Sequence, residues 1–361
     1  MIMYRTSVGL DVHARSVVAC AIDEATGEVL RCRCGGDPAV VVAWTRGLPG
    51  PVQATYEAGP TGFGLARQLE AAGVSCLVVA PSKLQRPTGD KVKTDVRDAE
   101  HLARLLRLGE ITAVRVPSIE QETARDLVRA REDTRQNLMA GRHRLSKLLL
   151  RHGLVYDDGN AWTQKHDRWL RSHRFELPGL RFAFESAYET VLQAAARRDR
   201  LDGQILEMAA DSEFTPIVRR LGALRGIAPL TGFALAVEIG DWSRFTGKSI
   251  GSFVGLVPSE YSTGSSRSQG SITKVGNAHA RRLLVEAAWQ HKRVLTVPGP
   301  VLQRRRRDLA PAVCARGDAG NLRLHRQWVK FIARRKRTVT ANVAIARELA
   351  GWCWSLAVMD Q

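Results

Sequence analysis

The sequence predicts an α/β N-terminal part with a mixed sheet flanked by helices, then a long helical arm, then a mainly α-helical C-terminal part. Residues 5–108 alternate short strand-like runs with amphipathic helical patterns, and residues 119–210 hold two long helical patterns. The remainder alternates helical patterns with Gly-containing turns. We therefore expect three domains, covering residues 1–115, 116–213 and 214–361, a division that suits a chain of 361 residues.

The N-terminal part begins with strand-like runs and continues as alternating strands and helices. The expected strands cover residues 8–13, 17–22, 28–32, 52–57 and 75–80. Helical patterns cover residues 38–48 and 63–72, and a third opens near residue 95. A hairpin-rich start followed by alternating β and α units predicts a mixed sheet with helices on its faces.

Four carboxylates lie in three short motifs of this part. Asp11 lies in the first strand, Glu57 ends a later one, and Asp95 and Asp98 stand three residues apart where a helical pattern opens. Carboxylates so placed can converge on hard cations such as Mg²⁺ (or Mn²⁺), and two such metals can clamp both oxygens of a phosphodiester exchange. Taken singly, each acid is better explained as a turn former or helix cap. The order of all four favours a metal site.

Other polar residues stand beside these acids. Strand alternation puts His13 on the same sheet face as Asp11, where it either supports the acidic site or is an exposed strand-end residue, and we favour the exposed residue. Lys91 and Lys93 either contact a phosphate near the metals or are solvated, and His101 is equally ambiguous.

The charge balance points to a polyanionic partner. Lys and Arg number 54 against 36 Asp and Glu, which gives a formal net charge of +18. Nucleic acid is the commonest such partner. A membrane is disfavoured, since no apolar run reaches the roughly 18 residues of a spanning helix. The start shows no signal-peptide layout and the six cysteines lack scaffold spacing, so we expect reduced thiols in a cytoplasmic protein.

The middle of the chain is helical and rich in arginine. Residues 119–152 and 181–210 form long helical patterns separated by a Trp-containing connector. They predict either an antiparallel arm with a coiled-coil interface or two core helices of a bundle.

The C-terminal part combines a turn, a polar loop and basic runs. Residues 224–235 form a Gly-containing turn between helices that could present backbone N–H groups to a phosphate, as in a helix-hairpin-helix element. The polar stretch 259–270 lies between helical patterns at 249–256 and 278–289. It is either a flexible loop or a nucleophile loop whose nearby cations neutralise a phosphate. Those cations are Arg267, Lys274, Arg281 and Arg282. The run Arg304, Arg305, Arg306 and Arg307 is predicted to contact DNA or RNA backbone.

Together these motifs resemble the recombinases of IS110-type insertion sequences. The N-terminal match covers Gly-Leu-Asp11, Tyr-Glu57-Ala-Gly and Thr-Asp95-Val-Arg-Asp98-Ala, and the C-terminal match covers residues 253–258, 270–274 and 280–284. The resemblance implies an RNase H-like (RuvC-like) domain whose four acids bind metal and a C-terminal serine that attacks DNA to form a covalent intermediate. It also implies a noncoding guide RNA and a homo-oligomer, dimer to tetramer, linked by a coiled coil.

The identity of the serine is open at one position. Members of the family usually have serine immediately before the loop glycine, and here that position is Thr263, preceded by Ser262. Alignment favours Thr263, whereas sterics favour Ser262, because the extra methyl of threonine crowds the phosphorus. We predict Ser262, with Ser265 and Ser266 as further alternatives.

The predicted function is therefore a transposase that exchanges the DNA strands of element ends and target. Two alternatives remain. The first is a RuvC-like endonuclease that hydrolyses branched DNA, for which both hydroxyls are dispensable. The second is a catalytically decayed nucleic-acid-binding protein.

Overall fold

The computed structural model describes residues 4–84, 94–264, 266–294 and 297–359. The chain forms two compact units, Met1–Ser118 and Ile119–Gln361. Among the described residues, no helix is long and apolar enough to cross a membrane.

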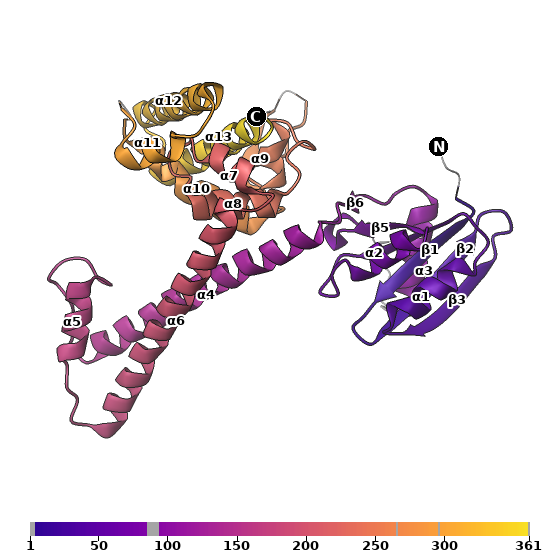
Figure 1. Cartoon of the computed structure of the whole chain (residues 1–361), viewed down its shortest axis with the longest axis horizontal. Coiled ribbons are helices and arrows are strands. Elements are labelled where there is room, and N and C mark those ends of the chain that lie inside the picture. Colours follow the sequence, from indigo (N-terminus) through magenta and orange to yellow (C-terminus); the bar gives the residue numbers. More distant parts are fainter. Residues whose placement is uncertain (1–3, 85–93, 265, 295–296, 360–361) are drawn as a thin grey trace. The chain divides into compact units, whose positions relative to one another are not determined.

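A six-stranded mixed sheet forms the centre of the N-terminal unit (Figure 1), as the sequence predicted. Its strand order is β3-β2-β1-β4-β5-β6. The first three strands pair antiparallel, β4 and β5 continue parallel to β1, and β6 returns antiparallel. The strands are β1 (Thr6–Val12), β2 (Ser16–Asp23), β3 (Val29–Gly35), β4 (Val52–Glu57), β5 (Ser75–Val79) and β6 (Ala113–Val114).

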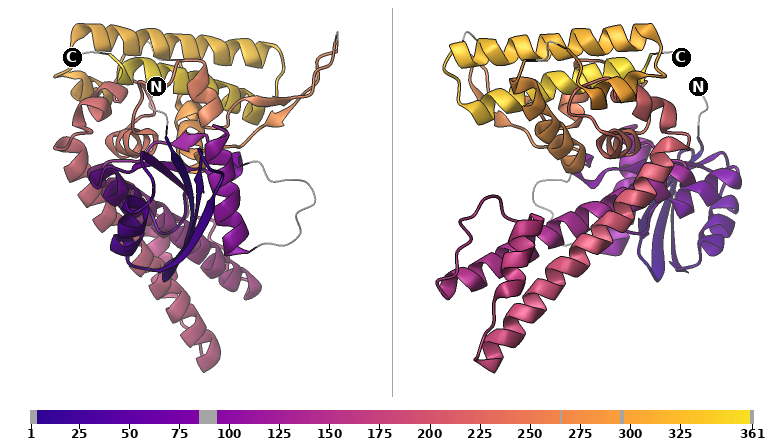
Figure 2. Two further views of the ribbon diagram at one scale, coloured as in Figure 1. Left: turned by 90° about the vertical axis from the view of Figure 1, so that its right-hand side faces the viewer. Right: turned by 60° about the vertical axis from the view of Figure 1, so that its left-hand side comes forward.

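Helices cover both faces of this sheet, with α1 (Pro38–Arg46) and α2 (Gly64–Ala71) on one side and α3 (Asp95–Arg107) on the other (Figure 2). Strand alternation explains the division. Val8 and Leu10 of β1 join the core formed with α1 and α2. The intervening Gly9 faces α3, where a side chain would lie 2.1 Å from the backbone oxygen of Ala99. Glycine at this position therefore lets α3 pack directly on the central strand.

Two long helices, α4 (Ile119–Arg151) and α6 (Pro178–Ala210), form an arm of the C-terminal unit. Each has 33 residues and is about 50 Å long at roughly 1.5 Å per residue. They pack against each other, and the short helix α5 (Gln164–Ser172) closes a small core near their far ends with Leu145, Leu170 and Phe184. At their other ends, Val128 and Ile205 join the main core of the unit. The two helices therefore form an arm at their far ends and part of the helical bundle at their other ends.

The rest of the C-terminal unit is a helical bundle around α8, whose residues Gly232–Ile239 are all buried. The largest fully buried side chain is Trp328, whose indole nitrogen donates to the backbone oxygen of Ala288 at 3.3 Å. A two-stranded sheet, β7 (Pro258–Glu260) and β8 (Gln269–Ile272), accompanies the bundle. The helices are α7 (Thr215–Leu221), α8 (Pro229–Ile239), α9 (Ser249–Phe253), α10 (Ala278–Ala288), α11 (Pro300–Arg306), α12 (Pro311–Ala333) and α13 (Thr338–Ala357).

The turn expected to resemble a helix-hairpin-helix element connects α7 to α8. Gly226 has a φ of 87°, and a side chain there would lie 2.6 Å from the backbone oxygen of Ala287 in α10. The N–H groups of Arg225 and Ile227 already donate to Asn321 and Leu224. Close packing against α10 therefore explains why residue 226 is glycine. Phosphate binding by the turn stays a prediction.

Candidate acidic site and serine hairpin

The sheet register places Asp11 and Glu57 side by side. Strands β1 and β4 run parallel, with Leu10 opposite Tyr56, so the next residue of each strand is one of the two acids. Neighbouring strands lie about 4.8 Å apart, and residues in register point to the same face. The ends of two central strands therefore present two carboxylates at one edge of the sheet.

The first turn of α3 adds further carboxylates to this edge. Asp11 lies two residues beyond Gly9, so strand alternation turns it towards the face that α3 covers. Thr94 caps α3 by accepting a hydrogen bond from the backbone N–H of Arg97, and Asp95 and Asp98 lie in the first turn. Negative charge at a helix N-terminus is stabilised by the helix dipole. The helix thus tolerates two acids close to a third.

Asp11, His13 and Asp95 form the one group among the described residues that could hold a metal ion, with ligand atoms within 4.8 Å of one another. His13 Nε2 lies 3.1 Å from Asp11 Oδ2 and 3.9 Å from Asp95 Oδ1. Burial raises the pKa of Asp11, His13 opposes that shift, and the charges of Asp95 and Asp98 add to it. A bound cation would relieve this repulsion, so the donor set suits a divalent metal.

Not all predicted ligands belong to this group. Glu57 and Asp98 lie beside it in the fold but outside the 4.8 Å group. His13 was predicted as an exposed strand-end residue; it is half exposed and also contacts Asp11. The sequence indicated this contact, because His13 lies two residues from Asp11 and strand alternation puts both on one face of the sheet. Lys91 and Lys93 lie outside the described residues.

The Ser/Thr/Gly-rich stretch forms a hairpin that continues β7 and β8. Tyr261 N–H donates to Ser268 O at 3.0 Å, and Thr263 and Ser266 exchange two backbone hydrogen bonds. The chain then turns at Gly264, whose φ is 54°. We call residues 258–264 and 266–272 the serine hairpin; Ser265, one of the alternative nucleophiles, lies outside the described residues. Its two candidate nucleophiles, Ser262 and Thr263, follow each other on a strand-like segment and so point to opposite faces.

Ser262 and not Thr263 has a carboxylate partner. The Ser262 hydroxyl donates to Glu260 Oε1 at 2.9 Å. Gln269 Nε2 donates to the other oxygen at 3.3 Å, and Arg267 Nε lies 3.4 Å from Oε1. The hydrogen bond from Ser262 lowers the pKa of Glu260, with smaller contributions from Gln269 and Arg267. Glu260 therefore stays ionised and orients the serine hydroxyl, although its low basicity makes it a weak proton acceptor.

The sequence matches of both units decide the family. Residues 8–153 match a transposase family of the IS110 type with a DEDD domain, and residues 218–298 match the family described as Transposase IS116/IS110/IS902. A Sinorhizobium fredii protein described as a transposase is 38% identical over 303 residues, covering 84% of this chain and 74% of its own. The transposase for insertion sequence element IS1533 of Leptospira borgpetersenii is 30% identical, covering 91% and 97%. The chain belongs to the IS110 family of transposases.

Family membership identifies a DNA-recombining enzyme of a mobile element, and the mixed sheet fits the RNase H-like fold of its DEDD domain. The transposase for insertion sequence element IS1111A of Coxiella burnetii is more distant, at 22% identity, covering 80% of this chain and 73% of its own. The DEDD domain is consistent with use of a divalent metal.

In this transposase, the serine hairpin is anchored at its exit by close backbone packing and by a buried carboxylate. A side chain at Gly276 would lie 2.0 Å from the backbone oxygen of Phe253. The next residue, Asn277, donates to Glu238 Oε2 at 2.7 Å. Glu238 also accepts two hydrogen bonds of 3.2 Å from Arg129 of α4 and lies 3.3 Å from His279 Nδ1. Burial raises the pKa of Glu238, but these partners outweigh it and hold the value at about 2.

The predicted nucleic-acid-binding cations of the C-terminal unit divide into two groups. Arg305 donates to Ile227 O, and Arg306 is 9% exposed, binding Asp318 at 2.6 Å and Ala223 O at 2.7 Å. Arg281 holds the backbone oxygens of Val254 and Val275, and Arg282 binds Glu132 and Glu286. These four guanidinium groups support the domain. The exposed members of the predicted set are Arg267, Lys274, Arg304 and Arg307.

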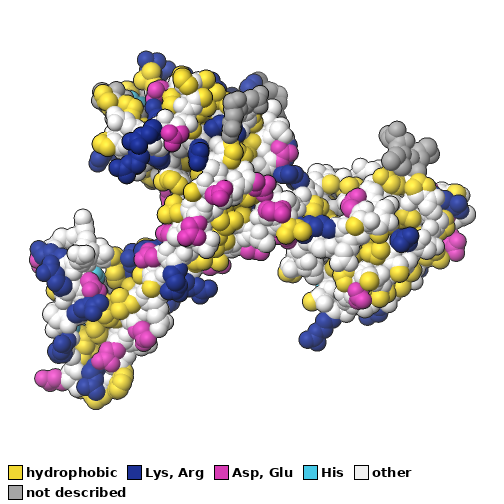
Figure 3. Space-filling model, in the orientation of Figure 1, with side chains coloured by type: hydrophobic (Ala, Val, Ile, Leu, Met, Phe, Trp, Pro, Cys, Tyr) yellow, Lys and Arg dark blue, Asp and Glu magenta, His cyan; other side chains and the backbone are white. Residues whose placement is uncertain are grey.

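Basic side chains gather on the C-terminal unit. On the face drawn in Figure 3, Lys and Arg cluster over the helical bundle and again near the far end of the arm, with fewer acids beside them. This pattern accords with the formal net charge of +18 and with DNA binding by the family.

Proposed function

We propose that this transposase exchanges DNA strands by covalent catalysis, with Ser262 as the nucleophile and the acidic set of the N-terminal unit holding Mg²⁺ (or Mn²⁺). The observation that carries the proposal is the 2.9 Å hydrogen bond from the Ser262 hydroxyl to Glu260. This distance lies within the reach of roughly 2.6–3.2 Å expected between a nucleophile and its partner. Thr263 has no side-chain hydrogen bond within the described part of the hairpin.

The residues proposed to hold the metal are Asp11, Glu57, Asp95 and Asp98. Their oxygens are the ligands that Mg²⁺ and Mn²⁺ prefer. When bound, the metal supplies Lewis-acid stabilisation of the charge on the scissile phosphate. His13 fixes the orientation of Asp11 through its hydrogen bond.

The proposed covalent step conserves the energy of the phosphodiester. Ser262 Oγ attacks phosphorus and forms a new ester, while the bond from phosphorus to a deoxyribose oxygen breaks. The serine proton passes to the departing oxygen, which leaves as a hydroxyl. Attack by the hydroxyl of another strand then reverses the step, rejoins DNA and restores serine. Exposed Arg267 and Lys274 neutralise charge on the phosphate.

Further partners are proposed from the same resemblance and from the exposed charges. Arg304 and Arg307 contact the backbone of DNA or of an element-encoded guide RNA, with the salt sensitivity expected of phosphate contacts. The long arm of α4 and α6 links subunits of a homo-oligomer. Exposed Phe182 and Leu177 near its far end support this role.

The test is detection of a covalent protein–DNA adduct on a denaturing gel, with element-end DNA, candidate RNA and Mg²⁺. We expect the adduct with wild type and with Thr263→Ala, and none with Ser262→Ala. Loss of the adduct in Thr263→Ala alone would make Thr263 the nucleophile. Metal-dependent cleavage without any adduct, unchanged in both variants, would replace the proposal with a hydrolytic nuclease.

A further inference from the structure

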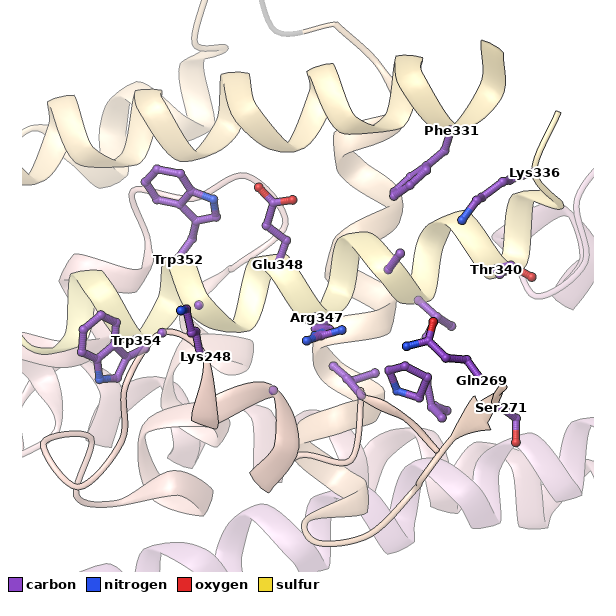
Figure 4. Close-up of a pocket in the computed structure, with 18 of the residues that line it drawn as sticks. Lys248, Gln269, Ser271, Phe331, Lys336, Thr340, Arg347, Glu348, Trp352 and Trp354 are labelled. Atoms are coloured by element: carbon purple, nitrogen blue, oxygen red, sulfur yellow. The ribbon is translucent and has the colours of Figure 1, made fainter. Parts of the chain in front are cut away.

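A groove in the C-terminal unit is not used by the chemistry described so far. It has a volume of about 1040 Å³ and runs along the outer surface of α13 between α12, α9 and β8. Figure 4 shows Lys248, Arg347 and Gln269 on the side of α13 nearest the hairpin strand, and Trp352 and Glu348 on the side nearest α12. We call this hollow the α13 groove.

The charges that line the α13 groove are mostly positive. Four cations and one carboxylate line it. The carboxylate, Glu348, is already paired with Arg323 at 2.8 Å. Lys248 and Arg347 are exposed, and neither has a side-chain hydrogen bond or ion pair among the described residues. These two cations of the groove are therefore available to an anionic ligand. The four cations are Lys248, Arg316, Lys336 and Arg347.

Aromatic side chains supply the apolar part of the groove. Trp354 packs over Gly247, where an added side chain would lie 3.3 Å from the indole ring. Trp352 and Phe331 line the groove as well and already carry cations over their rings, Arg316 at 4.5 Å and Lys336 at 5.1 Å. A basic groove interleaved with aromatic rings is the combination that binds single-stranded nucleic acid, through phosphates and bases together. The volume lies near the upper end of small-molecule pockets, about 300–1,000 Å³, and is too small for a double helix.

The α13 groove is continuous with the serine hairpin, and this continuity indicates which DNA strand the groove would bind. Gln269, Gly270 and Ser271 line the groove and belong to β8, and Gln269 donates to Glu260, the carboxylate that also accepts the Ser262 hydrogen bond. A strand lying in the groove is thus led directly along the hairpin towards the nucleophile. We propose that the α13 groove binds a single strand of DNA, the strand that Ser262 attacks, with phosphates on Lys248 and Arg347. This inference rests on the proposed function of Ser262.

The test is binding of a short fluorescent single-stranded DNA to the full-length protein, by anisotropy at several salt concentrations. The double variant Lys248→Ala/Arg347→Ala removes two phosphate contacts. Each phosphate contact on a single strand contributes roughly 0.7 to the slope of log affinity against log salt concentration. We therefore expect the magnitude of the slope to fall by about 1.4. At 0.1 M salt, one decade below 1 M, this change corresponds to a loss of affinity of about 25-fold. The matched control, Arg326→Ala/Lys330→Ala, removes two exposed cations of α12 outside the groove, and we expect a change below about twofold.

Equal losses in both double variants would overturn the proposal, because bulk charge would explain them. A single-stranded RNA of the same sequence forms a second arm, and a larger loss on RNA than on DNA would also overturn it. Unchanged melting temperatures exclude misfolding. Ser262→Ala should bind the strand like wild type. If wild type forms no adduct yet binding still depends on Lys248 and Arg347, the proposed function fails while the groove assignment stands.

Discussion

The acidic site and the serine hairpin hold their reactive side chains in different ways. Asp11 lies on the central strand of a sheet, and α3 packs against that strand at Gly9. Ser262 lies on an exposed hairpin and is oriented by one carboxylate, Glu260, that is itself 44% exposed. The first site depends on core packing and the second on polar contacts that water can replace. The comparison teaches that core packing positions Asp11, whereas exposed polar contacts position Ser262, the proposed nucleophile.

The largest expected effect comes from Asp11. Asp11→Asn keeps the size of the side chain but removes the charge next to His13 and Asp95. We expect adduct formation to slow by about 10³-fold, because metal stabilisation of a phosphate contributes several kcal/mol and each factor of ten corresponds to roughly 1.4 kcal/mol. Single-turnover adduct formation measures this. If Asp11→Asn slowed adduct formation less than Glu260→Gln does, the reaction would depend more on the serine hairpin than on the acidic site.

Glu238 tests whether the hairpin also needs support from the interior. Glu238→Gln removes the ion pairs of this buried carboxylate with Arg129 and Arg125, and we expect a loss of about 3 kcal/mol in unfolding free energy. Because the pKa of Glu238 falls from 4.5 to about 2 on folding, its contribution is complete above pH 4.5 and is lost as pH falls towards 2. Urea unfolding at several pH values measures both effects. The exposed control Glu185→Gln should change neither.

Gly9 tests the packing on which the acidic site rests. In Gly9→Ala, the new carbon would meet the backbone of Ala99 and Ala103 at 2.1 and 2.4 Å, so α3 must shift. We expect a loss of about 1–3 kcal/mol, as for other overpacked cores. Gly35→Ala is the matched control, since nothing lies within 4 Å of a side chain there. Thermal unfolding compares the two, and equal melting temperatures would contradict the close packing of α3.

The smallest effect is expected from Glu260. Glu260→Gln keeps an oxygen that accepts the Ser262 hydrogen bond but removes the charge. If Glu260 only orients the hydroxyl, adduct formation should slow by about tenfold, less than the 10²–10⁴ of general acid–base catalysis. Wild-type rates should fall as pH drops through the lowered pKa of Glu260, and the variant should lack that fall. A loss above 10²-fold would make Glu260 the base.

Much of the fold could be predicted from local patterns. The first five strands and the helices α3, α4 and α6 were predicted because strand alternation and helical spacing depend on neighbouring residues. The strand pairing within the serine hairpin could not be predicted, since its residues carry no apolar alternation and its strands are defined by backbone hydrogen bonds. The helix α5 in the connector was missed as well.

What the sequence by itself determined is the order of the elements, the net positive charge and the choice of acids that could hold a metal. Only the tertiary structure decided which polar groups meet. It joined His13 to Asp11 and Asp95, gave Ser262 rather than Thr263 a carboxylate, and used Arg306 to bind Asp318. The physical reason is that backbone conformation follows from near neighbours, whereas the partner of a polar side chain is set by how distant segments pack.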